Sequence, residues 1–91
     1  MAMTQDYEEL EVSEYDTGYA ANKTLLISNN GIISGSSILD VKASVIGGKT
    51  ERKSLSVGDS VRYDAGDKGL FEILLLTIKS GSAKFLVSRL K

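Results

Sequence analysis

Clusters of turn-forming residues recur about every ten residues along this chain, and no other feature constrains its fold as strongly. The clusters are "SNNG" (28–31), "SGSS" (34–37), "GGKT" (47–50), "VGDS" (57–60), "AGDKG" (65–69) and "SGS" (80–82). Glycine adopts the positive φ angles of tight hairpin turns, and Asn and Asp tolerate them. Short strands joined by such turns predict an all-β fold. We expect a small antiparallel barrel or a compact β-sandwich of about 6–8 short strands.

Between the turns, apolar and polar residues alternate, as they do in strands with one covered face. In "ILDVKASVI" the covered face is predicted to hold Leu39, Val41, Ala43 and Val45. By the same alternation Leu55 and Val57 face inward from "TERKSLSV", and Val61 and Tyr63 face inward from "SVRYD". The segments "KTLLIS" and "IIS", on either side of "NNG", are predicted to form a further short hairpin.

The chain is predicted to be one all-β domain over residues 1–91, with an acidic arm at residues 1–18. Six of the 12 Asp and Glu residues lie in residues 1–16, and all 11 Lys and Arg residues lie beyond them. "TQDYEELEVSEY" is the best helical candidate, but "ELEVSEY" alternates, and its Val12 and Tyr15 favour a strand. We therefore expect the arm to be mobile or to add a strand.

Two residue types that carry much of protein chemistry are missing, because the chain has no histidine and no cysteine. Imidazole general bases, Ser-His and Cys-His dyads, disulfides and His- or Cys-ligated metals are therefore excluded. We predict that the protein is not an enzyme and has no catalytic residue, metal site or cofactor. The alternative is an enzyme that uses carboxylates, for which the grouped acids are Asp59, Asp64 and Asp67.

The chain shows no targeting or membrane signal. Its N-terminus, "MAMTQDYEELEV", is acidic and lacks the apolar run of a secretory signal. No apolar run approaches the ~20 residues that span a bilayer. A content of 42% hydrophobic and 25% charged residues is ordinary for a soluble globular protein. We expect a cytoplasmic protein with no membrane partner.

Three short motifs are better explained as turns than as ligand sites. "GGKT" resembles the end of a phosphate-binding loop, but Ala43 stands where the loop needs glycine, and "TERKSLSV" indicates a strand where the loop needs a helix. "DAGDKG" (64–69) has too few oxygen ligands for calcium and predicts a hairpin loop. "SLSVGDSVRY" resembles turns of many small barrels, SH3-like and nucleic-acid-associated ones included, but identifies no family.

The segment "GLFEILLLTIK" (69–79) is apolar on both of its faces. One face is predicted to join the core, together with the last strand: Phe71, Ile73, Leu75, Phe85 and Val87. The other face is predicted to form an oligomer interface: Leu70, Leu74, Leu76 and Ile78. Exposing four such side chains would forfeit roughly 6–12 kcal/mol, as much as the whole stability of an ordinary domain.

Three covers for this second face are possible: the N-terminal segment, a second layer of the same domain, or another copy of the chain. A small β domain has few elements left for a second layer, so we favour a homo-oligomer. The predicted function is non-catalytic binding of a protein or a small ligand.

Two alternative functions remain. One is an accessory or inhibitor protein of a phage or mobile element. The other is a nucleic-acid-associated small β-barrel, although a pI near 5.3 is low for a nucleic-acid binder. Its candidate contacts are Lys49, Arg52, Lys53, Lys84 and Arg89.

Overall fold

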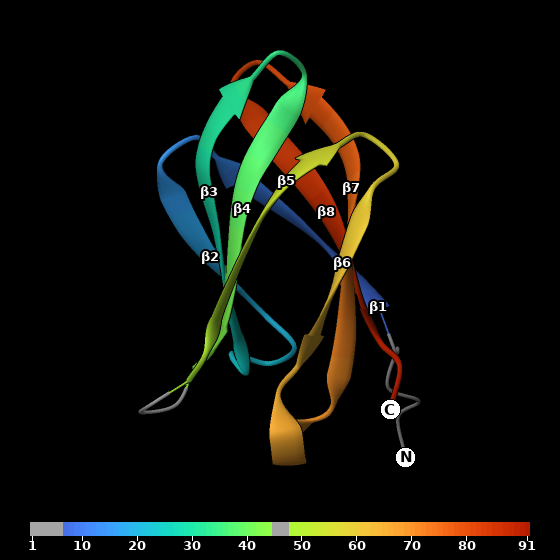
Figure 1. The fold of residues 1–91 in the computed structure, drawn as a ribbon. Coiled ribbons are helices and arrows are strands. Elements are labelled where there is room, and N and C mark those ends of the chain that lie inside the picture. Colours follow the sequence, from blue (N-terminus) through green and yellow to red (C-terminus); the bar gives the residue numbers. More distant parts are fainter. Residues whose placement is uncertain (1–6, 45–47) are drawn as a thin grey trace.

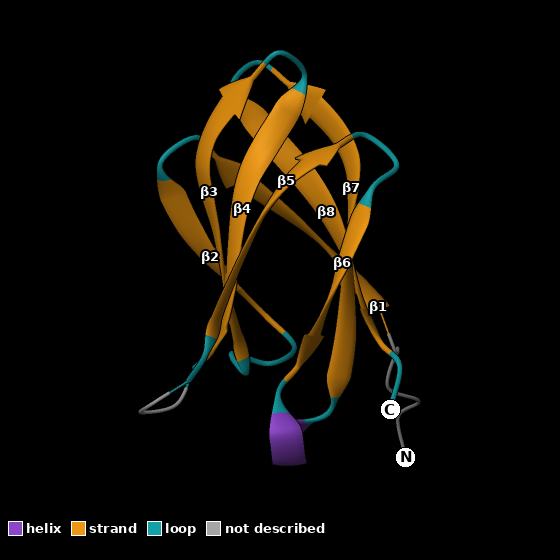
Figure 2. Ribbon diagram, in the orientation of Figure 1, coloured by secondary structure: helices purple, strands orange, loops and turns teal. Residues whose placement is uncertain are grey.

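The computed structural model describes residues 7–44 and 48–91. In these parts of the chain there are eight strands: β1 (Tyr7–Ser13), β2 (Asp16–Ala20), β3 (Leu25–Ile33), β4 (Ser36–Ala43), β5 (Thr50–Ser56), β6 (Ser60–Asp64), β7 (Leu70–Lys79) and β8 (Ser82–Arg89). The helical structure described is the 3₁₀ turn Gly66–Lys68, between β6 and β7 (Figure 2). The all-β prediction and the expected number of strands are confirmed.

The strands form two four-stranded antiparallel sheets, which we call sheet A (β1-β8-β7-β6) and sheet B (β2-β3-β4-β5). The chain runs up and down, and its first and last strands pair, as in an up-and-down barrel (Figure 1). The ladder is interrupted between β1 and β2 and between β5 and β6, so the barrel does not close. Of the two predicted architectures, the fold is therefore the two-layered one.

One hydrophobic core lies between the two sheets. Every strand contributes to it, and its buried residues are Val12, Ala20, Leu25, Ile27, Leu39, Val41, Ala43, Leu55, Tyr63, Phe71, Ile73, Leu75, Ala83, Phe85 and Val87. The inner face predicted for the last hairpin is confirmed in full. So is the covered face of "ILDVKASVI", except Val45, which lies outside the described residues.

Side chains join the sheets where the ladder breaks between β1 and β2. Asn29 on β3 is fully buried, and its Nδ2 donates a hydrogen bond to the carbonyl oxygen of Val12 on β1 (3.0 Å). Its Oδ1 accepts from the Gly31 N–H (3.2 Å) and the Ser37 hydroxyl (3.0 Å). The Asn29 side chain thus replaces the missing backbone pairing with polar bonds of its own, as a buried amide requires.

Side chains also join the sheets at the second break, between β5 and β6. The Tyr63 hydroxyl on β6 accepts a hydrogen bond from the Ala43 N–H (2.9 Å) and donates to the Lys49 carbonyl oxygen. Lys53 on β5 reaches the Ser60 carbonyl oxygen with its Nζ (3.3 Å). Charged side chains such as Lys53 also protect an edge strand from pairing with another chain.

The "NNG" segment is not a turn, contrary to the prediction. β3 runs through it, with a register shift between Asn29 and Ile32. Because the Asn29 side chain accepts the Gly31 N–H, and Glu14 Oε2 accepts the Ile32 N–H (2.8 Å), both backbone groups are satisfied without a chain reversal. The turn residues here make a β-bulge, an extra residue that bends one strand.

Two further predictions concern strand ends. Val57 does not face inward, because β5 ends at Ser56 and Val57 lies exposed in the following turn. The acidic segment adds a strand, since Tyr7–Ser13 pairs with β8; residues 1–6 of the predicted arm lie outside the described residues. The "SGSS", "VGDS", "AGDKG" and "SGS" turns occur as predicted, whereas Gly47 of the "GGKT" turn is not described.

Candidate interaction surfaces

The outer face of sheet A carries leucines at its centre and polar residues at its edges. Leu74 on β7 pairs directly with Leu86 on β8, and the same row ends at Glu9 on β1 and Ser60 on β6. The leucines of this face are half-buried in the isolated chain: Leu70, Leu74, Leu76 and Leu86. An apolar centre with a polar rim is typical of protein interfaces.

Ile78 does not belong to this outer face, although the alternation placed it there. A register shift between Leu75 and Thr77 makes Leu76 an extra residue on β7. Beyond this bulge the faces are exchanged, so Ile78 lies opposite the buried Ala83 and packs against the core. Of the four residues predicted for the interface, Leu70, Leu74 and Leu76 are on the outer face.

Neither of the intramolecular covers considered above lies over these leucines in the described structure. The segment Tyr7–Ser13 pairs edge-on with β8 and extends sheet A sideways instead of crossing its outer face (Figure 1). Sheet B packs on the inner face alone, through the common core. Within residues 7–44 and 48–91, the outer face of sheet A is therefore open.

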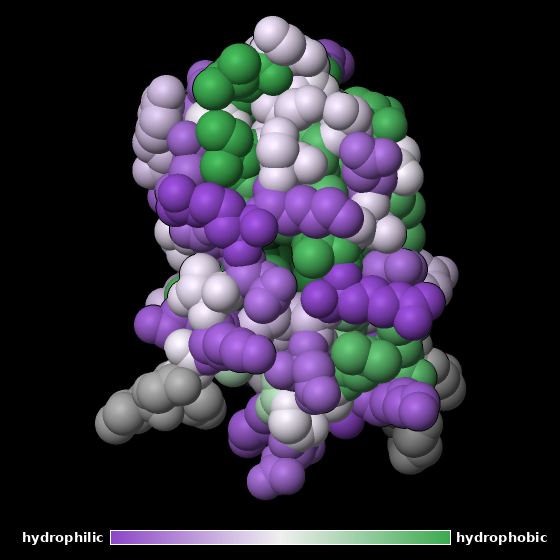
Figure 3. Space-filling model, viewed as in Figure 1, coloured by the Kyte–Doolittle hydropathy of each residue, from purple (hydrophilic) through white to green (hydrophobic). Residues whose placement is uncertain are grey.

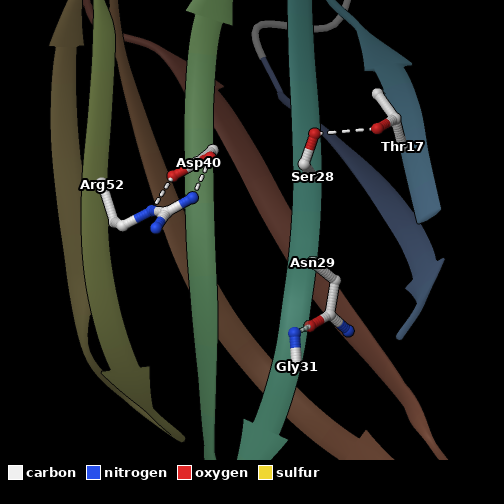
Figure 4. A network of polar contacts seen from close by, with 6 residues as sticks. All are labelled: Thr17, Ser28, Asn29, Gly31, Asp40 and Arg52. Carbon is white, nitrogen blue, oxygen red and sulfur yellow. Dashed lines mark hydrogen bonds and ion pairs between the residues drawn. The ribbon is translucent and has the colours of Figure 1, made fainter. Parts of the chain in front are cut away.

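The outer face of sheet B is polar and holds a shallow hollow of about 280 Å³. Its lining residues come from all four strands: Thr17, Leu26, Ser28, Asp40, Lys42 and Thr50. The strand register places Thr17, Ser28, Asp40 and Arg52 in one row across the sheet (Figure 4). In the view of Figure 3, hydrophilic side chains dominate the visible face and apolar ones form separate patches.

Hydrogen bonds fix the polar groups of this row. Arg52 donates two bonds to the Asp40 carboxylate, from Nε (2.7 Å) and from Nη2 (2.8 Å). The hydroxyls of Thr17 and Ser28 are bonded to each other (2.8 Å). The hydrogen bond from Arg52 holds the pKa of Asp40 below its usual value, although partial burial acts in the opposite direction.

The Asp40 pair predicts a small dependence of stability on acid. Because the pKa of Asp40 is lower in the folded chain, its contribution is present above the unfolded pKa of about 4 and is lost as pH falls through the folded value. Asp40→Asn should therefore lower the urea midpoint at pH 7 but have less effect at pH 3. The effect should be small, because the Arg52 side chain is 65% exposed. A larger loss at pH 3 than at pH 7 would contradict this.

The basic residues proposed to contact nucleic acid are divided between the two sheets. Lys49, Arg52 and Lys53 lie at or before β5 of sheet B, whereas Lys84 and Arg89 lie on β8 of sheet A. Several are engaged within the chain. Besides the Arg52 and Lys53 bonds, Lys84 Nζ is 3.7 Å from Glu9 Oε1, and the Arg89 guanidinium stacks 6.0 Å from the centre of the Phe71 ring.

The grouped acids lie at opposite ends of β6 and serve the turns there. The Asp59 carboxylate accepts the Ser56 N–H (3.1 Å), and the Asp64 carboxylate accepts the Gly66 N–H (2.9 Å). Asp67 is in the 3₁₀ turn. In the part of the chain that the structure describes, no three His, Cys, Asp or Glu residues are grouped as metal ligands, and no helix is long and apolar enough to cross a membrane.

No protein-family model, curated protein or solved structure was found to match this chain.

Two features of these surfaces were missed in the sequence. Leu86 is not among the residues predicted for the interface, although the alternation of "AKFLVS" places it opposite the core face of its own strand. The alternation of "ILDVKASVI" also places Asp40 and Lys42 on the strand face opposite the core. Their proximity to Thr17, Ser28 and Thr50 depends on strand register, for which the sequence offers no local signal.

Proposed function

We propose that this protein is a non-catalytic binding module that dimerises through the outer face of sheet A. One observation carries the proposal: Leu74 and Leu86 form a directly opposed apolar pair at the centre of a sheet face that no described segment covers. A single self-complementary face produces a closed two-fold dimer, the commonest symmetric assembly. The occupant of the face is thus a second copy of the chain.

The residues on the edge strands of sheet A support this pairing. A two-fold axis parallel to the strands would lay β1 of one copy over β6 of the other. Because Tyr7 and Arg62 lie in the same row across sheet A, that arrangement brings Tyr7 on β1 over the partner's Arg62, where an aromatic ring and a guanidinium can stack; both residues are exposed in the isolated chain. Glu72, the acid nearest the centre, accepts a hydrogen bond from the Ser60 hydroxyl (3.3 Å) and lies 3.7 Å from Arg62 Nε. The Glu72 carboxylate is therefore already paired within its own chain and is not left unpaired when the dimer forms.

The face is small, which favours a weak association. Four strands about 4.8 Å apart, with residues about 3.3 Å apart along each, form a face of roughly 500 Å². A dimer would therefore bury about 1,000 Å² in total, near the lower limit of specific interfaces. We expect a dissociation constant on the order of micromolar.

Replacing Leu74 with aspartate should dissociate this dimer. The introduced carboxylate would face the partner's leucines, and a cost of about 3 kcal/mol corresponds to a loss of more than 100-fold in affinity. Light scattering over a concentration series should give twice the 9.8 kDa chain mass for the parent protein and one chain mass for the variant.

Leu26→Asp is the matched control, since Leu26 is a half-buried leucine on the outer face of the other sheet. It should leave the dimer intact, and circular dichroism should show both variants folded. If Leu74→Asp unfolds the chain, Leu74→Thr keeps a strand-forming residue and tests the same contact. A parent protein that stays monomeric at hundreds of micromolar, or a dimer that both variants keep, would overturn the proposal.

A further inference from the structure

We propose that the hollow on the outer face of sheet B is a binding site for a neutral polyhydroxylated ligand, such as a sugar ring or a short oligosaccharide. The site lies on the opposite side of the molecule from the leucines of sheet A, so it is independent of the proposed dimer. It joins the two rows Thr17–Ser28–Asp40–Arg52 and Tyr19–Leu26–Lys42–Thr50, which run side by side across all four strands.

The hollow contains both hydrogen-bond donors and acceptors. The hollow presents three hydroxyls, one carboxylate that accepts and one ammonium that donates: Thr17, Ser28, Thr50, Asp40 and Lys42. The bond between the Thr17 and Ser28 hydroxyls uses one O–H, so this pair can still donate one hydrogen bond and accept others. A sugar hydroxyl also donates and accepts, so a ring bearing several of them can satisfy all five groups. A site with so few convergent polar groups selects ligands by matching their pattern.

The hollow is lined by side chains of both charges. Asp40 and Lys42 contribute opposite charges to the lining, and the Arg52 guanidinium is already bonded to Asp40. An anion such as phosphate would lie against the Asp40 carboxylate, and a cation would lie against Lys42. In either case like charges would be brought together, which disfavours a strongly charged ligand.

The Asp40 carboxylate, the main acceptor of the hollow, is held in a fixed orientation. Arg52 fixes the Asp40 carboxylate with two bonds, yet 21% of the Asp40 side chain remains exposed. An ionised carboxylate can accept about four hydrogen bonds, so lone pairs remain for ligand hydroxyls. Because the orientation of the group is already fixed, little conformational freedom is lost when a ligand binds.

An apolar surface lies beside the polar groups of the hollow. Leu26 lines the hollow, and its strand partner Tyr19 stands next to it with 53% of its surface exposed. A sugar ring carries C–H groups on its faces and hydroxyls around its edge. A leucine and an aromatic ring can pack against the first while the polar row binds the second.

The dimensions agree with one ring at a time. Small-molecule pockets usually measure about 300–1,000 Å³, and this hollow of about 280 Å³ is at their lower limit. The hollow is open to solvent, so a chain of sugars could continue beyond it. We therefore expect weak binding, with dissociation constants from tens of micromolar to millimolar, and tighter binding for oligosaccharides than for monosaccharides.

The test is a titration of the full chain, followed by backbone amide NMR. The probes are the neutral hexasaccharides of maltose, cellulose, laminarin, mannan, xylan and chitin type. Inorganic phosphate is the anionic competitor and glycine the zwitterionic one. With at least one hexasaccharide, the amide shifts should be concentrated at the lining residues of sheet B. Lys42→Ala and Tyr19→Ala should each weaken that binding about tenfold.

The controls separate this site from the rest of the molecule. Leu74→Asp, on the other sheet, should leave sugar binding unchanged whether or not it dissociates the dimer. The proposal is overturned if no hexasaccharide shifts the lining amides at up to about 10 mM, if phosphate or glycine binds there more tightly than every sugar, or if Lys42→Ala and Tyr19→Ala both bind as the parent does.

Discussion

Replacing Asn29 with aspartate is expected to lower the unfolding free energy at pH 7 by at least about 3 kcal/mol, a large part of the ~5–14 kcal/mol typical for a chain of this length. The two side chains have the same shape, so the packing is kept. However, the Nδ2 that donates to the Val12 carbonyl becomes an oxygen 3.0 Å from another oxygen. A charge is also placed at a residue with no solvent exposure.

The loss should depend on pH in a defined direction. Burial raises the pKa of the introduced carboxyl in the folded chain, so the penalty is full above that pKa and decreases as pH falls through it. Urea unfolding of the variant and the parent at pH 7 and at pH 4 should therefore give a smaller difference at pH 4.

Asn22→Asp is the control for Asn29→Asp, because it makes the same chemical change at an exposed turn between β2 and β3. It should change the unfolding free energy by less than about 0.5 kcal/mol. Equal losses in the two variants, or a loss at Asn29 that does not change with pH, would show that the inter-sheet hydrogen bond has little importance.

Much of this fold could be predicted because each strand covers one face, which alternation reports directly. Leu39 and Val41 are buried while Asp40 between them is not. The same reasoning failed where the backbone leaves the period of two. The bulge after Leu75 turned Ile78 into the core, and the Asn29 side chain turned an expected hairpin into a continuous strand. Both depend on contacts between residues far apart in the chain.

Two further turns are not predicted by the sequence pattern, because no glycine occupies their positive-φ positions. Tyr15, between β1 and β2, has a φ of 65°, and Ala21, Asn22 and Lys23, between β2 and β3, have φ of 55–68°. Non-glycine residues seldom adopt these angles, so composition predicts no turn there. Their position is set instead by tertiary bonds such as the one from the Glu14 N–H to the Gly81 carbonyl oxygen (2.9 Å).

The candidate surfaces show the same limit. Three of the four leucines on the outer face of sheet A could be predicted from one strand, because both faces of "GLFEILLLTIK" are apolar. The polar site of sheet B was not found, because it takes one or two residues from each of four strands. The register that aligns them is the outcome of folding, and a shift of one residue in any strand would send its side chain to the core.

Gly69→Ala is expected to be strongly destabilising. Gly69 precedes β7 with φ 118° and ψ 179°, a backbone conformation that is essentially restricted to glycine. A Cβ added there would also lie 2.5 Å from the carbonyl oxygen of Lys91, which accepts the Leu70 N–H (3.3 Å). Strain and the loss of this bond together predict a cost of roughly 2–4 kcal/mol in urea unfolding.

Two comparisons separate the parts of this cost. Gly66→Ala, in the same loop, has φ 63° and open space around the added Cβ, so it should cost only about 1–2 kcal/mol. In a chain ending at Leu90 the clash with Lys91 is removed, and Gly69→Ala should then cost less than in the full chain. The remaining cost is the backbone strain and the close approach of the added Cβ to the flexible Arg89 side chain, 3.1 Å from Nε. An equal cost in both chains would mean that Gly69 is required for its backbone angles and not for the close approach of the C-terminal residue to the start of β7.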